Sequence, residues 1–151
     1  MIYETLLSVF QPFLLLIIIT GVSLGIIWGA LPGLSTTMAM ALLIGFTSTM
    51  SQDVAICCML GVYTGSVFGG AISAILINIP GTPDAVPTMI EGHALAKKGE
   101  AGTALGTSIF GSFIGNWVGI LLLIFLMPFL IAIALKFKSW EMFLLAIIGI
   151  S

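Results

Sequence analysis

Charged residues are scarce in this sequence, and arginine is missing from it. Charged side chains make up 7% of the 151 residues, whereas a soluble domain carries roughly 25%. Four lysines without any arginine leave no basic patch for the phosphates of nucleic acid, so nucleic acid is excluded as a partner. Hydrophobic residues account for 60% of the chain, and the mean hydropathy is +1.28. The composition therefore predicts an integral membrane protein that lies in a lipid bilayer.

The side chains that carry most enzyme chemistry are also rare. His93 is the single histidine of the sequence, so no His-rich metal site can form, and no Ser/His/Asp set is apparent. We therefore expect neither an enzyme nor a resident cofactor. Cys57 and Cys58 are neighbours in an apolar run, and we interpret them as small hydrophobic residues rather than metal ligands or redox groups. His93 lies in a charged stretch and is interpreted as a solvated loop residue rather than a proton relay.

The apolar segments predict an all-α integral membrane protein, a polytopic helical bundle with broken or re-entrant helices. These segments lie near residues 13–31, 37–50, 54–79, 107–135 and 140–151. The first, third and fourth are long enough to cross the hydrocarbon layer. The second would span about 21 Å as a helix and is interpreted as a half-helix or re-entrant arm. The last begins a further span, so we expect the sequence to be the N-terminal part of a larger transmembrane domain.

Polar residues between the segments predict where helices begin. Asp53 follows a polar turn and is expected to cap the segment 54–79. Residues 88–106 hold four of the ten charged residues and predict a segment at the membrane surface. Within that segment, Thr88 and Glu91 have the spacing of a capping box.

Glycines recur every four residues in three of the long segments. The positions are Gly21, Gly25, Gly29 and Gly33 in the first, Gly61, Gly65 and Gly69 in the second, and Gly111, Gly115 and Gly119 in the third. Small residues at this spacing form one helix face and let two helix backbones approach closely in lipid. We interpret the stripes as packing surfaces rather than as direct contacts with a solute.

Two breaks interrupt the apolar segments, and each contains a Pro-Gly pair. In the first, Pro32 ends a helix, Gly33 permits an unusual backbone angle, and Ser35 or Thr36 can cap the next helix. The second break runs from Asn78 to Pro87, where Pro80, Pro83 and Pro87 are all expected to interrupt the helices. Unpaired backbone groups are costly in a bilayer, so such breaks are tolerated where they are buried in protein or line a water-filled site.

The breaks therefore predict a site for a solute or an ion. The candidate substrate-binding residues come from the two breaks and from the helix that enters the second one. They are Pro32, Gly33, Ser35, Thr36, Thr37, Gly69, Gly70, Ser73, Asn78, Pro80, Gly81 and Thr82. If the two breaks approach each other, amides and hydroxyls near Ser35 and Thr82 could hold carboxylates. Asn78 and the carbonyls freed by Pro80 are candidates for a coupling cation.

Three blocks of sequence resemble the N-terminal part of the TctA family, the large permease subunit of the tripartite tricarboxylate transporters. They are GALPGLSTTMAMALL (Gly29–Leu43), GVYTGSVFGGAISAILINIPGTPDAVPT (Gly61–Thr88) and EGHALAKKGEAGTALG (Glu91–Gly106). The blocks occur in this order and hold 59 of the 151 residues, within a stretch, 29–106, that covers just over half of the chain.

The resemblance implies a permease of a secondary transporter in the bacterial inner (cytoplasmic) membrane. Its substrates would be tricarboxylates or related organic acids, and a gradient of sodium or protons would drive uptake. The implied partners are a small TctB-like membrane subunit and a TctC-like periplasmic solute-binding protein that delivers the carboxylate substrate. A passive channel and a membrane scaffold without transport are the alternatives that the residues alone leave open.

Overall fold

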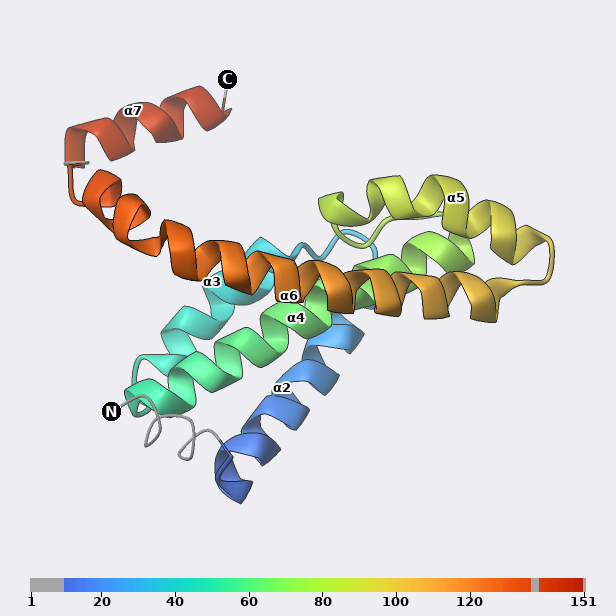
Figure 1. The fold of residues 1–151 in the computed structure, drawn as a ribbon, viewed down its shortest axis with the longest axis horizontal. Coiled ribbons are helices and arrows are strands. Elements are labelled where there is room, and N and C mark those ends of the chain that lie inside the picture. The colour runs from blue at the N-terminus through green and yellow to red at the C-terminus, as the bar shows by residue number, and fades with distance from the viewer. Residues whose placement is uncertain (1–9, 137–138, 151) are drawn as a thin grey trace. The chain divides into compact units, whose positions relative to one another are not determined.

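The structure is a computed structural model that describes residues 10–136 and 139–150, and every regular element in these ranges is helical. The elements are α2 (Pro12–Ala30), α3 (Thr36–Thr47), α4 (Gln52–Ile77), the short 3-10 helix η1 (Pro83–Ala85), α5 (Val86–Lys97), α6 (Ala101–Ala134) and α7 (Ser139–Ile150) (Figure 1). Helices α2, α4 and α6 are long and apolar enough to cross a membrane. The expected fold class, an all-helical protein with several helices that could cross a membrane, is confirmed.

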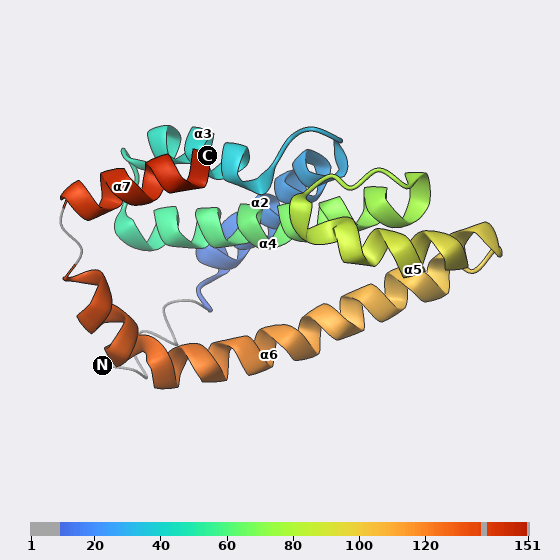
Figure 2. The ribbon, with the colours of Figure 1, turned by 90° about the horizontal axis from the view of Figure 1, so that it is seen from above.

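Helix α4 is the element against which α2, α3 and α5 pack (Figures 1 and 2). The glycines of α2 and α4 face one another in a register in which the residue numbers of both helices rise together, so the two helices run parallel. Thr36 at the start of α3 bonds to Ser66, while Thr47 near its end contacts Met59, so α3 runs antiparallel to α4. The C-terminal ends of α2 and α4 therefore lie on the same side of this unit as the start of α3.

The contact between α2 and α4 joins backbone to backbone. A Cβ atom on Gly25 would overlap the carbonyl oxygen of Val62, and one on Gly65 would overlap that of Val22. We define the seam as Gly21, Gly25 and Gly29 of α2 with Gly61, Gly65 and Gly69 of α4. The same overlap occurs at each of these glycines except Gly21, where a Cβ atom would make a tight contact of 3.1 Å with the carbonyl oxygen of Cys58. The predicted packing role is confirmed for these six glycines, since only glycine lets the helices come this close. It was wrong for Gly33, the fourth glycine of the first predicted stripe, which lies beyond the end of α2 and where a Cβ atom would meet no described atom within 4 Å.

The first break has the conformation that its residues predict. Helix α2 ends at Ala30, and Leu31 adopts an extended conformation because it precedes a proline. Gly33 has a φ of 93°, which disfavours any residue with a side chain. Ser35 is the N-cap of α3, and its Oγ accepts a hydrogen bond from the amide of Met38 at 3.2 Å. Of the two expected caps, Ser35 is therefore the correct one.

The second break is shorter than predicted. Helix α4 ends at Ile77, and Asn78 takes a left-handed conformation with a φ of 57°. The irregular segment ends at Thr82, because Pro83 starts η1 and Pro87 lies in the first turn of α5. The expectation that all three prolines break the helices was wrong for these two. A proline in a first turn costs nothing, since that position has no intrahelical acceptor for an N–H group.

Two predicted caps were also wrong. Helix α4 starts one residue before Asp53, which lies in its first turn, and Ser51 occupies the N-cap position. A carboxylate there still interacts favourably with the helix dipole. Thr88 lies inside α5, whose N-cap is Ala85, so the capping-box spacing of Thr88 and Glu91 does not mark a helix start.

The chain divides into two compact units, the first ending at Ile109 and the second starting at Phe110. The described part of the second unit consists of most of α6 and of α7. A Cβ atom on Gly111, Gly115 or Gly119 would have no described atom within 4 Å. Within its own unit, the third glycine stripe therefore has no described packing partner.

The observed helices in the second half of the chain differ in their bounds from the expected segments. Helix α6 starts at Ala101, before the expected 107, so part of the predicted surface segment 88–106 belongs to α6 and most of the remainder to α5. Helix α7 occupies nearly all of the expected segment 140–151, of which Ser151 lies outside the described residues. Which of these helices cross the bilayer, and the re-entrant role of α3, stay predictions.

Candidate functional site

The two breaks meet at one pocket. Gly33 and Ser35 from the first break and Pro80, Gly81, Thr82 and Pro83 from the second line a hollow of about 310 Å³. The four lining residues of the second break come from the segment that leaves α4 and enters η1. Segments far apart in the sequence thus supply the two walls of the pocket.

The pocket exists because the chain turns back after α4. Helix α4 continues about two turns beyond the end of α2 in the register of their glycines. The segment after Asn78 then folds back, and the amide of Gly81 donates to the carbonyl of Gly70 at 3.5 Å. A Cβ atom on Gly81 would overlap the carbonyl oxygen of Gly29, so glycine is required for this close approach to the end of α2.

The first wall of the pocket is the N-terminus of α3. Ser35 is half-buried, and its hydroxyl oxygen accepts from Met38, which leaves the hydroxyl hydrogen for an external acceptor. The amides of Thr36 and Thr37 are in the first turn, where an α-helix offers no acceptor. Their partial positive charge favours an anion at this end of the helix.

A buried hydrogen bond fixes this wall to α4. The hydroxyls of Thr36 and Ser66 lie 3.0 Å apart, and Ser66 is fully buried. Thr36 therefore turns toward α4 and is not among the residues that line the pocket. Ser66 was missed by the sequence analysis, because nothing in its local sequence distinguishes it from other serines in apolar helices.

The second wall carries a buried hydroxyl without a partner. Thr82 is 2% exposed, and its Oγ1 atom makes no hydrogen bond to any residue that the structure describes. Its side chain lies against Gly70, where a Cβ atom would overlap it. The hydroxyl of Ser73 lies next to Gly81, where a Cβ atom would be 2.8 Å from its Oγ atom. This hydroxyl donates a hydrogen bond to the carbonyl of Gly70 at 3.0 Å. An unpaired buried hydroxyl costs about 1–3 kcal/mol, so the retention of the Thr82 hydroxyl calls for a functional reason.

The remaining candidate residues are not among those that line the pocket. Gly69 faces Ile26 of α2 and belongs to the seam. Pro32, Thr37 and Asn78 are exposed and are not lining residues of the hollow. A contact of any of these residues with a solute stays a prediction.

His93 is not the solvated loop residue that its position in the sequence indicates. It lies on α5, is half-buried, and its Nδ1 atom is 2.9 Å from the carbonyl oxygen of Ile75 on α4. Because a carbonyl oxygen only accepts, Nδ1 carries the proton in this bond. No sequence signal links two residues that are this far apart in the chain, so only the structure reveals the contact.

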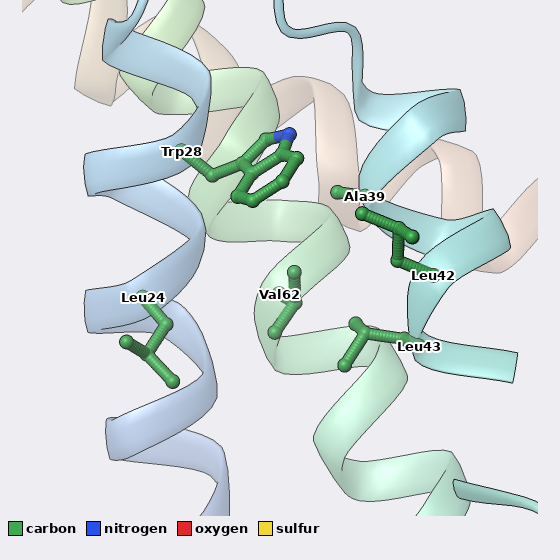
Figure 3. A pocket seen from close by; sticks show the side chains of 6 residues that line it. All are labelled: Leu24, Trp28, Ala39, Leu42, Leu43 and Val62. Carbon is green, nitrogen blue, oxygen red and sulfur yellow. The ribbon is translucent and has the colours of Figure 1, made fainter. Parts of the chain in front are cut away.

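A second pocket lies between α2, α3 and α4 and is wholly apolar. It has a volume of about 170 Å³ and is lined by Leu24, Trp28, Ala39, Leu42, Leu43 and Val62 (Figure 3). The indole of Trp28 projects from α2 past α4 toward α3, and its buried Nε1 atom has no hydrogen-bond partner in the described chain. Trp28 Nε1 is the single polar side-chain atom among the six lining residues, so this pocket is a poor candidate for a carboxylate.

Comparison with known proteins places the chain in a family. A family model described as "Tripartite tricarboxylate transporter TctA family" matches residues 15–151. A similar protein is the "Uncharacterized 52.8 kDa protein in TAR-I ttuC' 3'region" of Agrobacterium vitis, 39% identical over 130 residues, which are 86% of this chain and 26% of that protein. The chain thus spans about a quarter of that relative's length. No solved structure matches the chain. Because the family model covers nearly the whole sequence, the chain belongs to the TctA family of tripartite tricarboxylate transporters.

Proposed function

We propose that this chain is part of the permease subunit of a tripartite transporter in the bacterial inner membrane, and that the pocket between its two breaks holds a carboxylate of the transported organic acid. One observation carries the proposal. Two Pro-Gly breaks from distant parts of the sequence form a single pocket, and the buried Thr82 hydroxyl in its wall lacks a partner among the described residues.

The chemistry of the pocket suits an anion bound by neutral groups. None of its six lining residues is charged. The Ser35 hydroxyl, the Thr82 hydroxyl and the first-turn amides of α3 are all donors that a carboxylate can accept from. Broken helices whose N-termini point at the substrate are a recurrent design in secondary transporters. Neutral donors also bind without a permanent ion pair, which favours release of the substrate into the cell.

The proposal includes the whole transporter. A TctC-like periplasmic binding protein delivers a tricarboxylate or related organic acid, a TctB-like membrane subunit completes the complex, and a gradient of sodium or protons drives uptake. Asn78 follows the last residue of α4, and its exposed position supports a role for its amide near the coupling cation. Accumulation of the acid against its concentration gradient distinguishes this transporter from a passive channel.

The proposal is tested by replacing the unpaired hydroxyl of Thr82 with a methyl group. In the full-length permease with its partners, Thr82→Val is expected to lower the uptake of radiolabelled citrate and of related di- and tricarboxylates about tenfold, because the bound carboxylate loses a donor. Thr82→Ser, which keeps the hydroxyl, should retain uptake. Thermal stability should be unchanged or higher in Thr82→Val, since an unpaired buried hydroxyl is replaced by an apolar group of the same shape.

Thr20→Val is the matched control. Thr20 is exposed on α2, and its hydroxyl bonds only to carbonyls of its own helix. The same substitution there should leave uptake unchanged. Uptake by Thr82→Val equal to that of the native permease, at equal amounts of protein in the membrane, would contradict the assignment of Thr82 to the substrate site.

A further inference from the structure

The end of α4 has carbonyl groups that need donors. The last four carbonyls of an α-helix have no amide of the same helix to bond with. In α4 the carbonyl of Ile75 belongs to this group, and the chain that follows does not cap it, because Asn78 turns into a left-handed conformation and the next residues leave toward Gly70. The donor that reaches the carbonyl of Ile75 is Nδ1 of His93, from the opposite side of the second break.

The residue before His93 brings α5 against the same point. Gly92 is buried, and a Cβ atom there would lie 2.7 Å from Cγ1 of Ile75. Ile75 itself is fully buried. Gly92 and His93 therefore hold α5 on the side chain and on the carbonyl of a single residue of α4. We name this contact of Gly92 and His93 with Ile75 the α5 clamp.

The clamp closes a loop that contains one wall of the pocket. The residues between Ile75 and Gly92 include the irregular segment 78–82, which carries Gly81 and Thr82. Within the described chain, a single backbone hydrogen bond ties this segment to the body of α4, at the limiting length of 3.5 Å. The Thr82 hydroxyl adds no bond of its own to a described residue. Besides the packing of Gly81 and Thr82 against Gly29 and Gly70, the position of the wall is therefore set by where α4 ends and where α5 is held.

We propose that His93 is a positioning residue for the pocket: by clamping α5 to the last turn of α4, its Nδ1–H group holds Thr82 and Gly81 against α2 and Gly70. His93 is not a lining residue, so it acts through the segment 78–82 and not by touching the solute. The effect on transport rests on the proposed function, whereas the effect on the geometry of the segment does not.

Two substitutions separate the hydrogen bond from the bulk of the side chain. In His93→Asn, the amide nitrogen is two bonds from Cβ, as Nδ1 is in histidine, so the donor is kept. In His93→Leu, the donor is lost while an apolar side chain fills the space. Leucine is the better helix former of the two, so weaker helix propensity cannot explain a loss in His93→Leu.

The first measurement is hydrogen–deuterium exchange on the purified full-length permease. We expect amides of the segment 78–82 to exchange about fivefold faster in His93→Leu than in the native protein, because the unclamped loop opens more often. Exchange should be native-like in His93→Asn, and the amides of α2 should be unaffected in both. Native-like exchange of the segment in His93→Leu, or equally fast exchange in both variants, would overturn the inference.

The second measurement is the kinetics of citrate uptake in the same preparations. His93→Leu should raise the KM about fivefold with little change in kcat per folded permease, and His93→Asn should restore the KM. Thr82→Val is measured beside them. If Thr82→Val impairs uptake while His93→Leu has a native KM, the clamp is refuted and the pocket stands. If Thr82→Val has no effect while His93→Leu accelerates exchange, the clamp stands and the proposed function fails.

Discussion

Two regions of the molecule carry the same glycine pattern and use it differently. In the seam, glycines four residues apart on α2 lie against glycines four apart on α4, with no space for a Cβ atom at most of these positions. In α6, Gly111, Gly115 and Gly119 repeat the spacing, yet a Cβ atom on any of them would have no described atom within 4 Å. The spacing therefore shows that a helix face can approach a neighbour closely, but it does not identify the neighbour.

The two regions differ because the glycines of the seam face a second glycine stripe, whereas those of α6 face none within the described part of their own unit. The seam has two matching stripes in one compact unit, and beside it the buried Ser66 bonds to the start of α3. The register that the seam sets also places the ends of α2 and α4 on the same side of the unit, and the chain folds back after α4, so that both breaks reach the same pocket. The seam is thus the structural basis of the candidate site, while the stripe on α6 has no such role among the described residues.

The largest expected effect comes from adding a methyl group inside the seam. Gly65→Ala should destabilise the full-length permease by about 2 kcal/mol or more, because the new Cβ overlaps the Val22 carbonyl and the two backbones must separate. Thermal unfolding in detergent measures the effect. Gly45→Ala is the control, since Gly45 lies within α3 and a Cβ atom there would meet no described atom within 4 Å. Equal stability of the two variants would mean that the seam is not tightly packed.

A smaller effect is expected where backbone conformation, and not space, requires glycine. A Cβ atom on Gly33 would have no described atom within 4 Å, but the φ of this residue is 93°. Gly33→Ala should therefore cost about 1–2 kcal/mol through backbone strain alone. Gly33→Asn should cost less, since asparagine tolerates positive φ better than alanine. The melting temperatures of the two variants provide the comparison, and a melting temperature unchanged in Gly33→Ala would contradict the observed turn.

The smallest effect is expected on α6. Gly115→Ala should leave the stability unchanged or raise it by up to about 1 kcal/mol, because alanine is the better helix former and its methyl group meets no described atom. The same thermal unfolding assay applies. A loss of stability as large as that of Gly65→Ala would show that this stripe is a tightly packed interface like the seam.

Much of the fold can be predicted from local sequence. Apolar runs mark the long helices, Pro32 marks the end of α2, and Ser35 marks the start of α3. These predictions succeed because the cause of each feature lies within a few residues. The length of the second break was overestimated because the effect of a proline depends on its place in a helix. A proline breaks a helix interior but is tolerated in a first turn, and the sequence alone does not reveal that Pro87 is in one.

The site is less predictable, because it depends on contacts between distant residues. The sequence identifies each break, but their meeting depends on the parallel register of α2 and α4, which brings Ser35 and Thr82 to one pocket. The bond of His93 to Ile75 and that of Thr36 to Ser66 join different helices in the same way. Several predicted residues, including Gly69, lie outside the pocket because the same helix also has a packing face.

The central claim is that the two breaks form a common pocket, and a cross-link between them tests it most directly. Cysteines are placed at Ser35 and Pro83, one in each wall, in a full-length permease in which Cys57 and Cys58 are replaced by alanine. A short bifunctional thiol reagent in native membranes should join the two positions, and bound citrate should slow the reaction. Labelling of each single cysteine without any cross-link in the double variant would contradict the account.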